Sequence, residues 1–526
     1  MEIIDQHTKK IMEGCKERAR EAGLRFDDES IEYIVTNQDL IELSPKGMIP
    51  TLYDYWVHDL EVLKGRREYE LYPHNPYETV INSRPPLSFY NDNNPDWLNV
   101  MIFYHVLAHI DFMQNNGYFR HTWDDDFVGL ALADKRLIND LRTKHGRWVD
   151  YVIEFTRGID NITGYYQVLS DINAAEYTPK PGRIDYFFDV FLQKIKNVQA
   201  PEYLKEIDSY NDTKRESPLD AEEILLSGIR NRFPEFENLY EKYQAEKAPK
   251  PRDIIEYLMR YSPFLNKEEN IWMKSVMQIV RNTALYFEPQ RRTKIMNEGW
   301  ATYWHFELFL QDDRINGHEA DFARVNAFVT ALPKLGMNPY AIGWRLFQHI
   351  EEMAEKGRFS FEFDKLRDVE ERKHFDKKTG KGRDFIFKLR NECCDFNFVN
   401  NYVTQDFADR HKLVIIGERI NEQRMTKEYY IKSKNAEDYK KLILDNLVHP
   451  PFITVSDETQ KNGTLCIVHN YEGKQLVPEF IENVMMGIEY LWGGEVKLET
   501  HLIKKGQAEK ITYTMKDRKL SSNASY

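Results

Sequence analysis

Residues 296–305, MNEGWATYWH, constrain the fold more than any other segment, because they set two ionisable side chains in an otherwise apolar and aromatic run. A helix turns about 100° per residue, so Glu298 and His305, seven positions apart, share one helix face with Thr302 between them. Burying a carboxylate costs several kcal/mol unless it is paired, hydrogen-bonded or bound to a metal. The fold must therefore bring a compensating group to Glu298.

A second apolar run, residues 97–113, predicts a helix that is buried all round, because its hydrophobicity is almost continuous. His105 and His109 stand at positions i and i+4 of this helix, where two imidazoles can reach one cation. Together with Glu298 they complete a three-ligand set for catalytic zinc and leave a fourth position for water. We therefore predict a zinc site formed by His105, His109 and Glu298, with His305 beside it as a catalytic acid/base group.

Two simpler explanations of these residues stay open. Buried histidines are more often satisfied by hydrogen bonds than by metals. Arg291 and Arg292 lie roughly two turns before Glu298 and could neutralise its carboxylate in a buried Glu–Arg network that only fixes helix packing.

The predicted metal motif also lacks one group. In HExxH metallohydrolases the residue after the first histidine is the glutamate that acts as general base. Val106 holds that position here and has no acid/base chemistry. A metal-bound water would need another base, such as His305 or Asp111, or the site performs no hydrolysis.

Composition limits the classes of function. A chain of 526 residues predicts about two or three domains, and a net charge of −13 argues against non-specific binding to nucleic acid. The four cysteines form no disulfide framework, and no signal peptide or run of roughly 20 apolar residues is present, so we expect a cytoplasmic protein without a membrane span.

The pattern along the chain predicts a mainly α-helical body with a small α+β C-terminal domain. The helical body spans residues 1–405 and carries charged insertions near 205–252 and 354–384, and the α+β domain spans 411–515. Residues 516–526 are polar and are expected to be a disordered tail. Within the body, residues 24–96 are expected to mix short helices with Pro- and Asn-rich turns. The α+β domain is expected to contain strands at 413–416, 429–431, 465–468 and 496–500 and helices at 436–447 and 477–492.

Several motifs resemble those of the stage V sporulation protein R (SpoVR) family. They are YFEPQ at residues 286–290, MNEGWATYWH at 296–305, NPYAIG at 338–343, HIDFMQNN at 109–116, FNFV at 396–399 and YLWG at 490–493. The resemblance covers residues 25–515. It implies a role in spore development, specifically in forming the peptidoglycan cortex, and it implies partners in the pathway of a PrkA-type serine kinase. It implies no agreed biochemical activity.

This sequence departs from the family pattern at one histidine. The pattern places the upstream histidine five residues before the second one, and Tyr104 occupies that position here. Either His105 replaces it from a neighbouring position, or His109 alone matters.

A shorter resemblance concerns chemistry. Residues 297–303, NEGWATY, are similar to the NEGFAxY segment of aminopeptidase N-type gluzincins, in which the glutamate is the third zinc ligand. The order of elements agrees, with the histidine pair first and the glutamate helix later. Two hypotheses follow. The first is a zinc-dependent amide hydrolase acting in peptidoglycan metabolism, and the second is a non-catalytic scaffold or regulatory protein of sporulation or stress.

Overall fold

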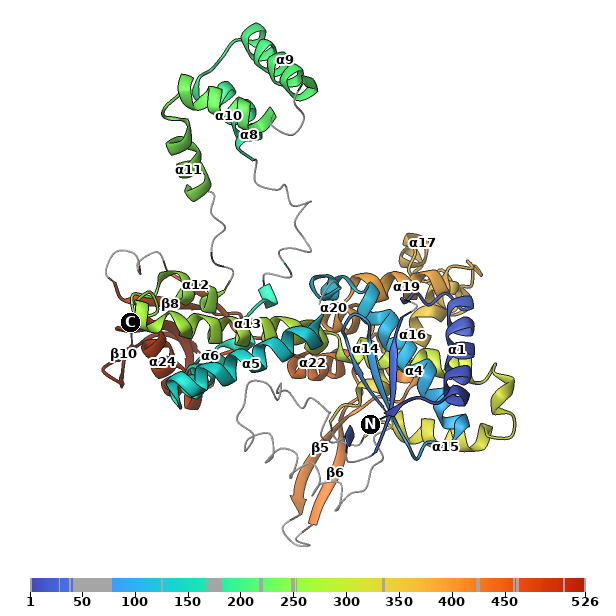
Figure 1. The fold of residues 1–526 in the computed structure, drawn as a ribbon. Coiled ribbons are helices and arrows are strands. Elements are labelled where there is room, and N and C mark those ends of the chain that lie inside the picture. The colour runs from blue at the N-terminus through green and yellow to red at the C-terminus, as the bar shows by residue number, and fades with distance from the viewer. Residues whose placement is uncertain are drawn as a thin grey trace. The chain divides into compact units, whose positions relative to one another are not determined.

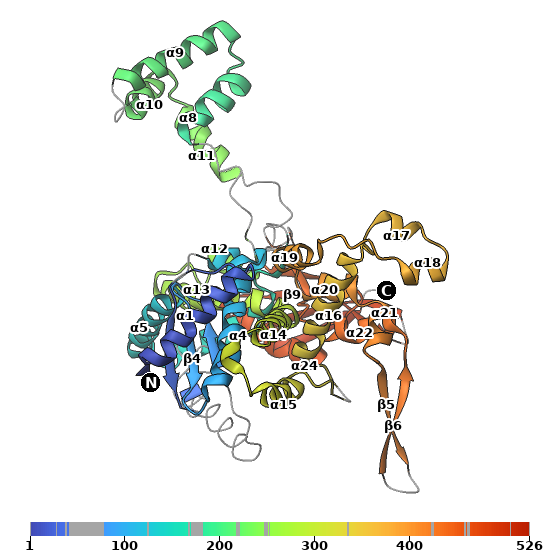
Figure 2. The same ribbon diagram turned by 90° about the vertical axis from the view of Figure 1, so that its right-hand side faces the viewer.

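The computed structural model describes residues 2–524 except 28, 37–38, 41–77, 124–125, 167–168, 170–181, 217–220, 247–250, 252, 334–335, 422–425, 457–458, 460–462 and 505–506. The chain divides into two compact units (Figures 1 and 2). The first contains Met1–Val168 and Asp253–Tyr526, and the second contains Leu169–Arg252.

Helix α4, Asp96–Asn115, lies at the centre of the first hydrophobic core. Every residue of α4 from Leu98 to Met113 is buried, which confirms the helix predicted from the apolar run. The helices that pack around it or share its core are α1 (Gln6–Glu21), α14 (Lys294–Phe309), α16 (Pro339–Glu355), α19 (Gly382–Glu392) and α20 (Asp395–Tyr402).

Helix α14 is fixed at its start and along its side. The buried carboxylate of Asp395 accepts hydrogen bonds from the backbone N–H groups of Ile295 (2.8 Å) and Met296 (2.9 Å), so it satisfies two donors of the first turn. Beside it, Gly299 of α14 faces Gly343 of α16. A Cβ atom at Gly299 would lie 2.4 Å from Gly343, and one at Gly343 would lie 2.1 Å from the backbone oxygen of Ile295. The two helices approach this closely only because both positions are glycine.

A four-stranded sheet precedes α4, so the prediction of short helices within residues 24–96 was wrong for 31–35, 78–81 and 87–91, which are strands. Its order is β1–β2–β4–β3, and only β2 and β4 are parallel. The strands are β1 (Glu2–Ile3), β2 (Ile31–Val35), β3 (Glu78–Ile81) and β4 (Leu87–Asn91). In β2, β3 and β4 the side chains on both faces are at least partly buried, which hides the alternation that marks a half-exposed strand. Part of the expected turn region, 41–77, lies outside the described residues.

The second core of this unit joins the C-terminal sheet to helices from the middle of the chain. The sheet has the order β11–β10–β9–β8–β7 and packs with α24, α6, α12 and α13 around Ile255, Val276, Ile467 and Leu491. The elements are α5 (Phe127–His145), α6 (Trp148–Arg157), α12 (Ile254–Tyr261), α13 (Ile271–Arg292), β7 (Phe452–Val455), β8 (Leu465–Asn470), α24 (Pro478–Trp492), β9 (Val496–Lys504), β10 (Gln507–Lys516) and β11 (Lys519–Ala524).

The predicted fold class, a mainly helical protein with a small α+β part at the C-terminus, is confirmed. The expectation of a disordered tail at 516–526 was wrong for Lys519–Ala524, because β11 pairs in register with β10 and completes the sheet. The boundary predicted near residues 405–411 does not separate the cores. Helix α22 (Ala436–Asn446) packs in the first core, and α13 packs in the second.

The remaining elements of this unit surround the two cores. They are η1 (Gly117–Thr122), η2 (Asp160–Ile162), η4 (Glu268–Asn270), η5 (Asp313–Ile315), α15 (Glu319–Val329), α17 (Phe361–Lys365), α18 (Val369–His374), α21 (Gln405–Arg410) and an antiparallel hairpin of β5 (Ile415–Asn421) and β6 (Thr426–Ser433). Helices α17 and α18 fall in the predicted charged insertion at 354–384. None of the helices in the described part of the chain is both long and apolar enough to cross a membrane.

The second unit has a hydrophobic core of its own, rich in aromatic rings, to which Tyr186, Phe187, Phe191 and Phe236 contribute. It contains the charged insertion predicted near 205–252, whose described residues are mostly helical. Its elements are α8 (Arg183–Asp185), η3 (Tyr186–Ile195, a π-helix), α9 (Ala200–Glu216), α10 (Ala221–Arg232) and α11 (Phe236–Glu246).

The Gly299–Gly343 contact can be tested by Gly299→Ala. Although alanine favours helices by about 1 kcal/mol, its methyl group would meet the α16 backbone, and we expect a net loss of about 1–3 kcal/mol in the free energy of unfolding, measured by urea denaturation. Gly494→Ala is the control, because a Cβ there meets atoms only at 3.7 Å or beyond. Equal stability of the two variants would contradict the close approach.

Candidate metal centre

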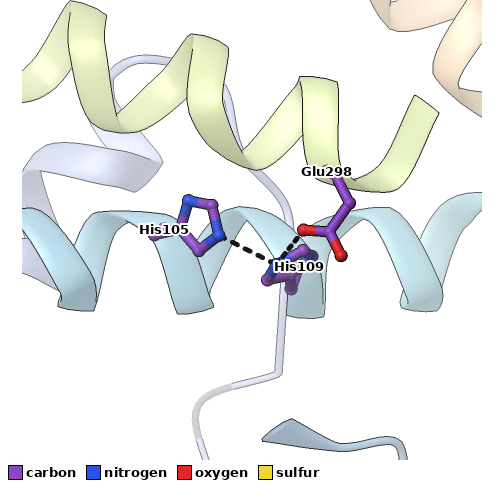
Figure 3. A group of neighbouring side chains, drawn as sticks. All are labelled: His105, His109 and Glu298. Atoms are coloured by element: carbon purple, nitrogen blue, oxygen red, sulfur yellow. Dashed lines mark hydrogen bonds and ion pairs between the residues drawn. The ribbon is translucent and has the colours of Figure 1, made fainter. Parts of the chain in front are cut away.

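Helices α4 and α14 pack side by side with opposite chain directions, so each end of the predicted site pairs one residue from each helix (Figure 3). At one end His105 Nδ1 lies 2.9 Å from His305 Nδ1. At the other, His109 Nε2 lies 3.5 Å from Glu298 Oε2. Between the ends the two Nε2 atoms of His105 and His109 are 3.1 Å apart. The structure thus brings together all four residues selected from the sequence.

In the part of the chain that the structure describes, no arginine forms an ion pair with Glu298. Its Oε2 atom is buried and accepts no hydrogen bond from the described residues. Arg292 instead forms an ion pair with Glu288 at 2.9 Å, and its guanidinium lies over the ring of Tyr165, with 3.8 Å between Cζ and the ring centre. Among the described residues the Glu–Arg network that the sequence allowed around Glu298 therefore does not form. Its carboxylate faces His109 and Tyr340 instead.

The hydrogen bonds around the histidines determine which ring nitrogens carry protons. His109 Nδ1 donates to the amide oxygen of Asn297 at 2.9 Å, and His305 Nε2 donates to that of Asn326 at 3.1 Å, because an amide oxygen can only accept. With its proton on Nε2, neutral His305 must accept at Nδ1 from His105 Nδ1–H. Both Nε2 atoms that face each other are therefore left as lone pairs, which repel unless a cation or a proton lies between them.

Burial keeps two of these rings neutral. It lowers the pKa of His105 well below its ordinary value, and the neighbouring rings of His109 and His305 act in the same direction. Burial likewise lowers the pKa of His305 to about 4, against the opposing effect of the Asn326 hydrogen bond. Neutral imidazole is the form that binds a metal.

The spacing of the three donors fits a tetrahedral metal ion. Zinc–nitrogen bonds of about 2.0–2.1 Å place neighbouring tetrahedral ligands about 3.3 Å apart. The distance between the two Nε2 atoms is 3.1 Å, that from His109 Nε2 to the Glu298 carboxylate is 3.5 Å, and all three ligand atoms lie within 4.8 Å of one another. Two imidazoles and one carboxylate suit zinc, and also Fe(II) in the facial-triad arrangement.

The sequence of this chain matches the model of the SpoVR like protein family over residues 3–449. The chain belongs to the SpoVR family. It is also similar to the uncharacterized protein YcgB of Escherichia coli (strain K12), with 26% identity over 493 residues that cover 89% of this chain and 87% of YcgB. No solved structure matches. The similarity of NEGWATY to gluzincins stays a prediction.

The motifs that indicated the SpoVR family have physical roles in this fold. Gly299 and Gly343, from NEGWATY and NPYAIG, form the close contact between α14 and α16. Asn116, the last residue of HIDFMQNN, donates to the backbone oxygens of Arg390 (2.7 Å) and Cys393 (2.9 Å). Asp395 precedes FNFV and caps α14. The motif residues thus orient the helices that carry the histidines and Glu298.

Glu78 lies beside the candidate site of this SpoVR protein, and the sequence did not reveal it. Its Oε1 atom lies 3.9 Å from His105 Nε2, so a second carboxylate faces the histidine pair. Burial, followed by the charge on Glu298, raises the pKa of Glu78 to about 8. Tyr340 of α16 also faces both carboxylates, and burial followed by the charges of Glu298 and Glu78 raises its pKa well above the usual range. Glu78 begins β3 in a stretch expected to form turns, and no local pattern singles it out.

Two residues considered beside the site have packing contacts instead. The Asp111 carboxylate accepts from the Arg25 backbone (2.7 Å), Trp300 Nε1 (2.8 Å) and Arg390 (2.9 Å), so it is not available as a base. Burial nonetheless raises the pKa of Asp111 to about 6, against the opposing charge of Arg390. Thr302 donates to the backbone oxygen of Glu298 within α14.

Substituting Arg390 tests the packing role of Asp111. Arg390→Met leaves the Asp111 carboxylate buried beside an apolar chain, and we expect a loss of about 3–5 kcal/mol in the free energy of unfolding by urea denaturation. The double variant Asp111→Asn with Arg390→Met removes the unpaired charge and should recover part of that loss. If the double variant were no more stable than Arg390→Met, the unpaired charge of Asp111 would not be the reason for the stability that Arg390→Met loses.

Proposed function

We propose that this SpoVR protein is a metal-dependent hydrolase that cleaves an amide bond. The observation that carries the proposal is the convergence of the Nε2 lone pairs of His105 and His109, both buried, with the partly buried carboxylate of Glu298. Two lone pairs that face each other are compensated best by a cation, and the 3.1 Å and 3.5 Å spacings fit zinc.

His105, His109 and Glu298 would hold the ion, with zinc as the first choice. A bound metal of this kind lowers the pKa of its water and polarises a carbonyl oxygen. Glu78 reaches the same histidine pair from β3 and supplies the carboxylate that is absent at Val106. It is our candidate for the general base, and since its pKa is raised to about 8 it would act in its ionised form, which is favoured as the pH rises through that value. The ionised carboxylate would take the proton of the attacking water and give it to the leaving amine.

His305 fits a positioning role better than the acid/base role inferred from sequence. Both of its ring nitrogens are hydrogen-bonded inside the protein, to His105 and to Asn326. Through this chain it keeps the proton of His105 on Nδ1 and leaves Nε2 for the metal. Asn297 does the same for His109.

The family suggests a substrate and partner proteins for the proposed hydrolase. A role in spore development suggests an amide of peptidoglycan, as in cortex formation, and partners from the pathway of a PrkA-type kinase. The four cysteines are all free thiols, which supports a cytoplasmic location.

The alternative is a non-catalytic scaffold or regulator of sporulation or stress. Val106 supports it, because the helix that offers the histidines lacks the usual base. In that protein a proton on His109 would replace the metal, and the cluster would serve only to join α4 and α14.

Metal content distinguishes the two functions. The purified protein should contain about one metal ion per chain by elemental mass spectrometry, and His109→Ala and Glu298→Gln should each lose most of it, since each removes a ligand. Glu307→Gln is the matched control on the same helix. A wild type without stoichiometric metal would refute the hydrolase, and metal that survives both substitutions would refute these ligands.

The role of Glu78 is tested by Glu78→Gln in the metal-loaded protein. We expect it to keep its metal and to lose about 100-fold or more in the release of amino groups from soluble peptidoglycan fragments, followed by mass spectrometry, because general-base catalysis contributes about 10²–10⁴-fold. Full activity of this variant would exclude Glu78 as the base. Loss of the metal would make it a ligand instead.

A further inference from the structure

The second core of the first unit contains a cavity of about 560 Å³ between α24 and the C-terminal sheet. This volume lies within the range of about 300–1,000 Å³ typical of small-molecule sites. Its wall is aliphatic, with side chains from η2, α12, β8, β9 and α24, among them Ile162, Ile254, Ile467, Val484, Ile488 and Leu498.

Several polar lining residues gather at one end of the cavity. Strands β7 and β8 are antiparallel, and Ile453 lies opposite His469. The segment before β7, with His449, and the segment after β8, with Glu472 and Lys474, therefore meet at that end. Aliphatic walls with polar groups at one end fit a ligand that has an apolar part and a polar group at one end.

His469 is a buried polar group at this end, with 4% of its surface exposed. Its Nδ1 atom is hydrogen-bonded to the Thr500 hydroxyl at 2.8 Å, which leaves Nε2 for a ligand. It lies on the same face of β8 as Leu465 and Ile467, so it is held in place by the sheet.

One positive charge at this end, that of Lys474, is open to an anion. Glu472 is already engaged, since it accepts from the Tyr166 hydroxyl at 3.1 Å and lies 3.7 Å from His449 Nε2. No described carboxylate lies within ion-pair distance of Lys474, so its charge is open to a ligand. At the rim, Val477 is 50% and Phe480 64% exposed, which leaves apolar surface for a chain that extends beyond the cavity.

We propose that this cavity binds an amphiphile with one aliphatic chain and an anionic head, such as a fatty acid, with the chain against the aliphatic wall and the head at His469 and Lys474. The site shares no residue with the proposed metal centre. Its test is therefore independent of the hydrolase proposal.

The test uses the full-length protein and a fluorescent 18-carbon polyene fatty acid. We expect saturable binding of one molecule per chain. Val484→Trp places an indole in the cavity from a partly exposed position of α24 and should weaken binding at least tenfold. Lys519→Glu, on β11 and outside the lining, should bind as the wild type does. Matching thermal unfolding curves would show that Val484→Trp is folded.

The head group is tested separately. Lys474→Glu should weaken binding of the fatty acid several-fold. The matching uncharged fatty alcohol, which displaces the fluorescent probe from the cavity, should bind this variant with the same affinity as the wild type. Equal effects on both would overturn the anionic head. The site would be overturned if the wild type showed no saturable binding, or if a folded Val484→Trp bound as well as the wild type. The cavity would then fit the apolar side chains of a protein partner instead.

Discussion

The close packing of α14 between α4 and α16 is the contact on which the rest of the helical core depends. It requires glycine at 299 and 343 and is fixed by the Asp395 cap at the start of α14. Because α4 and α14 run in opposite directions, the same contact brings Glu298 to His109 and His305 to His105. Tyr340, one turn before Gly343 on α16, is placed beside the two carboxylates by the same approach. A change in this packing would therefore change the distances between the candidate metal ligands.

Much of this arrangement could be predicted from the sequence, because the information was local. The unbroken apolar run predicts α4, the i and i+4 spacing predicts a shared face for His105 and His109, and the burial cost of Glu298 requires a partner. The residues that were missed act over long sequence distances. Glu78 comes from an edge strand in a segment without a clear period, and Asn326 contacts His305 from a separate helix. Strand β11 was missed because its polar residues form an edge strand, whose stability depends on pairing with β10.

The site also shows why a set of candidate ligands does not define a catalyst. Each histidine is oriented by an amide oxygen, directly for His109 and through His305 for His105, so the residues behind the ligands decide which nitrogen is offered. Val106 stands where HExxH metallohydrolases carry their general base. The carboxylate of Glu78, on a different element, lies 3.9 Å from His105 Nε2.

The separate aromatic core of residues 169–252 has a consequence for how the protein unfolds. We expect a unit with its own core to unfold as a cooperative event of its own. The urea transition that reports on substitutions at Gly299 and Arg390 is then that of the first unit, and the inserted unit would give a transition of its own. The chain can be viewed as one protein interrupted by another, in which the inserted unit can gain or lose stability, and so change in sequence, without altering the core that contains the histidines.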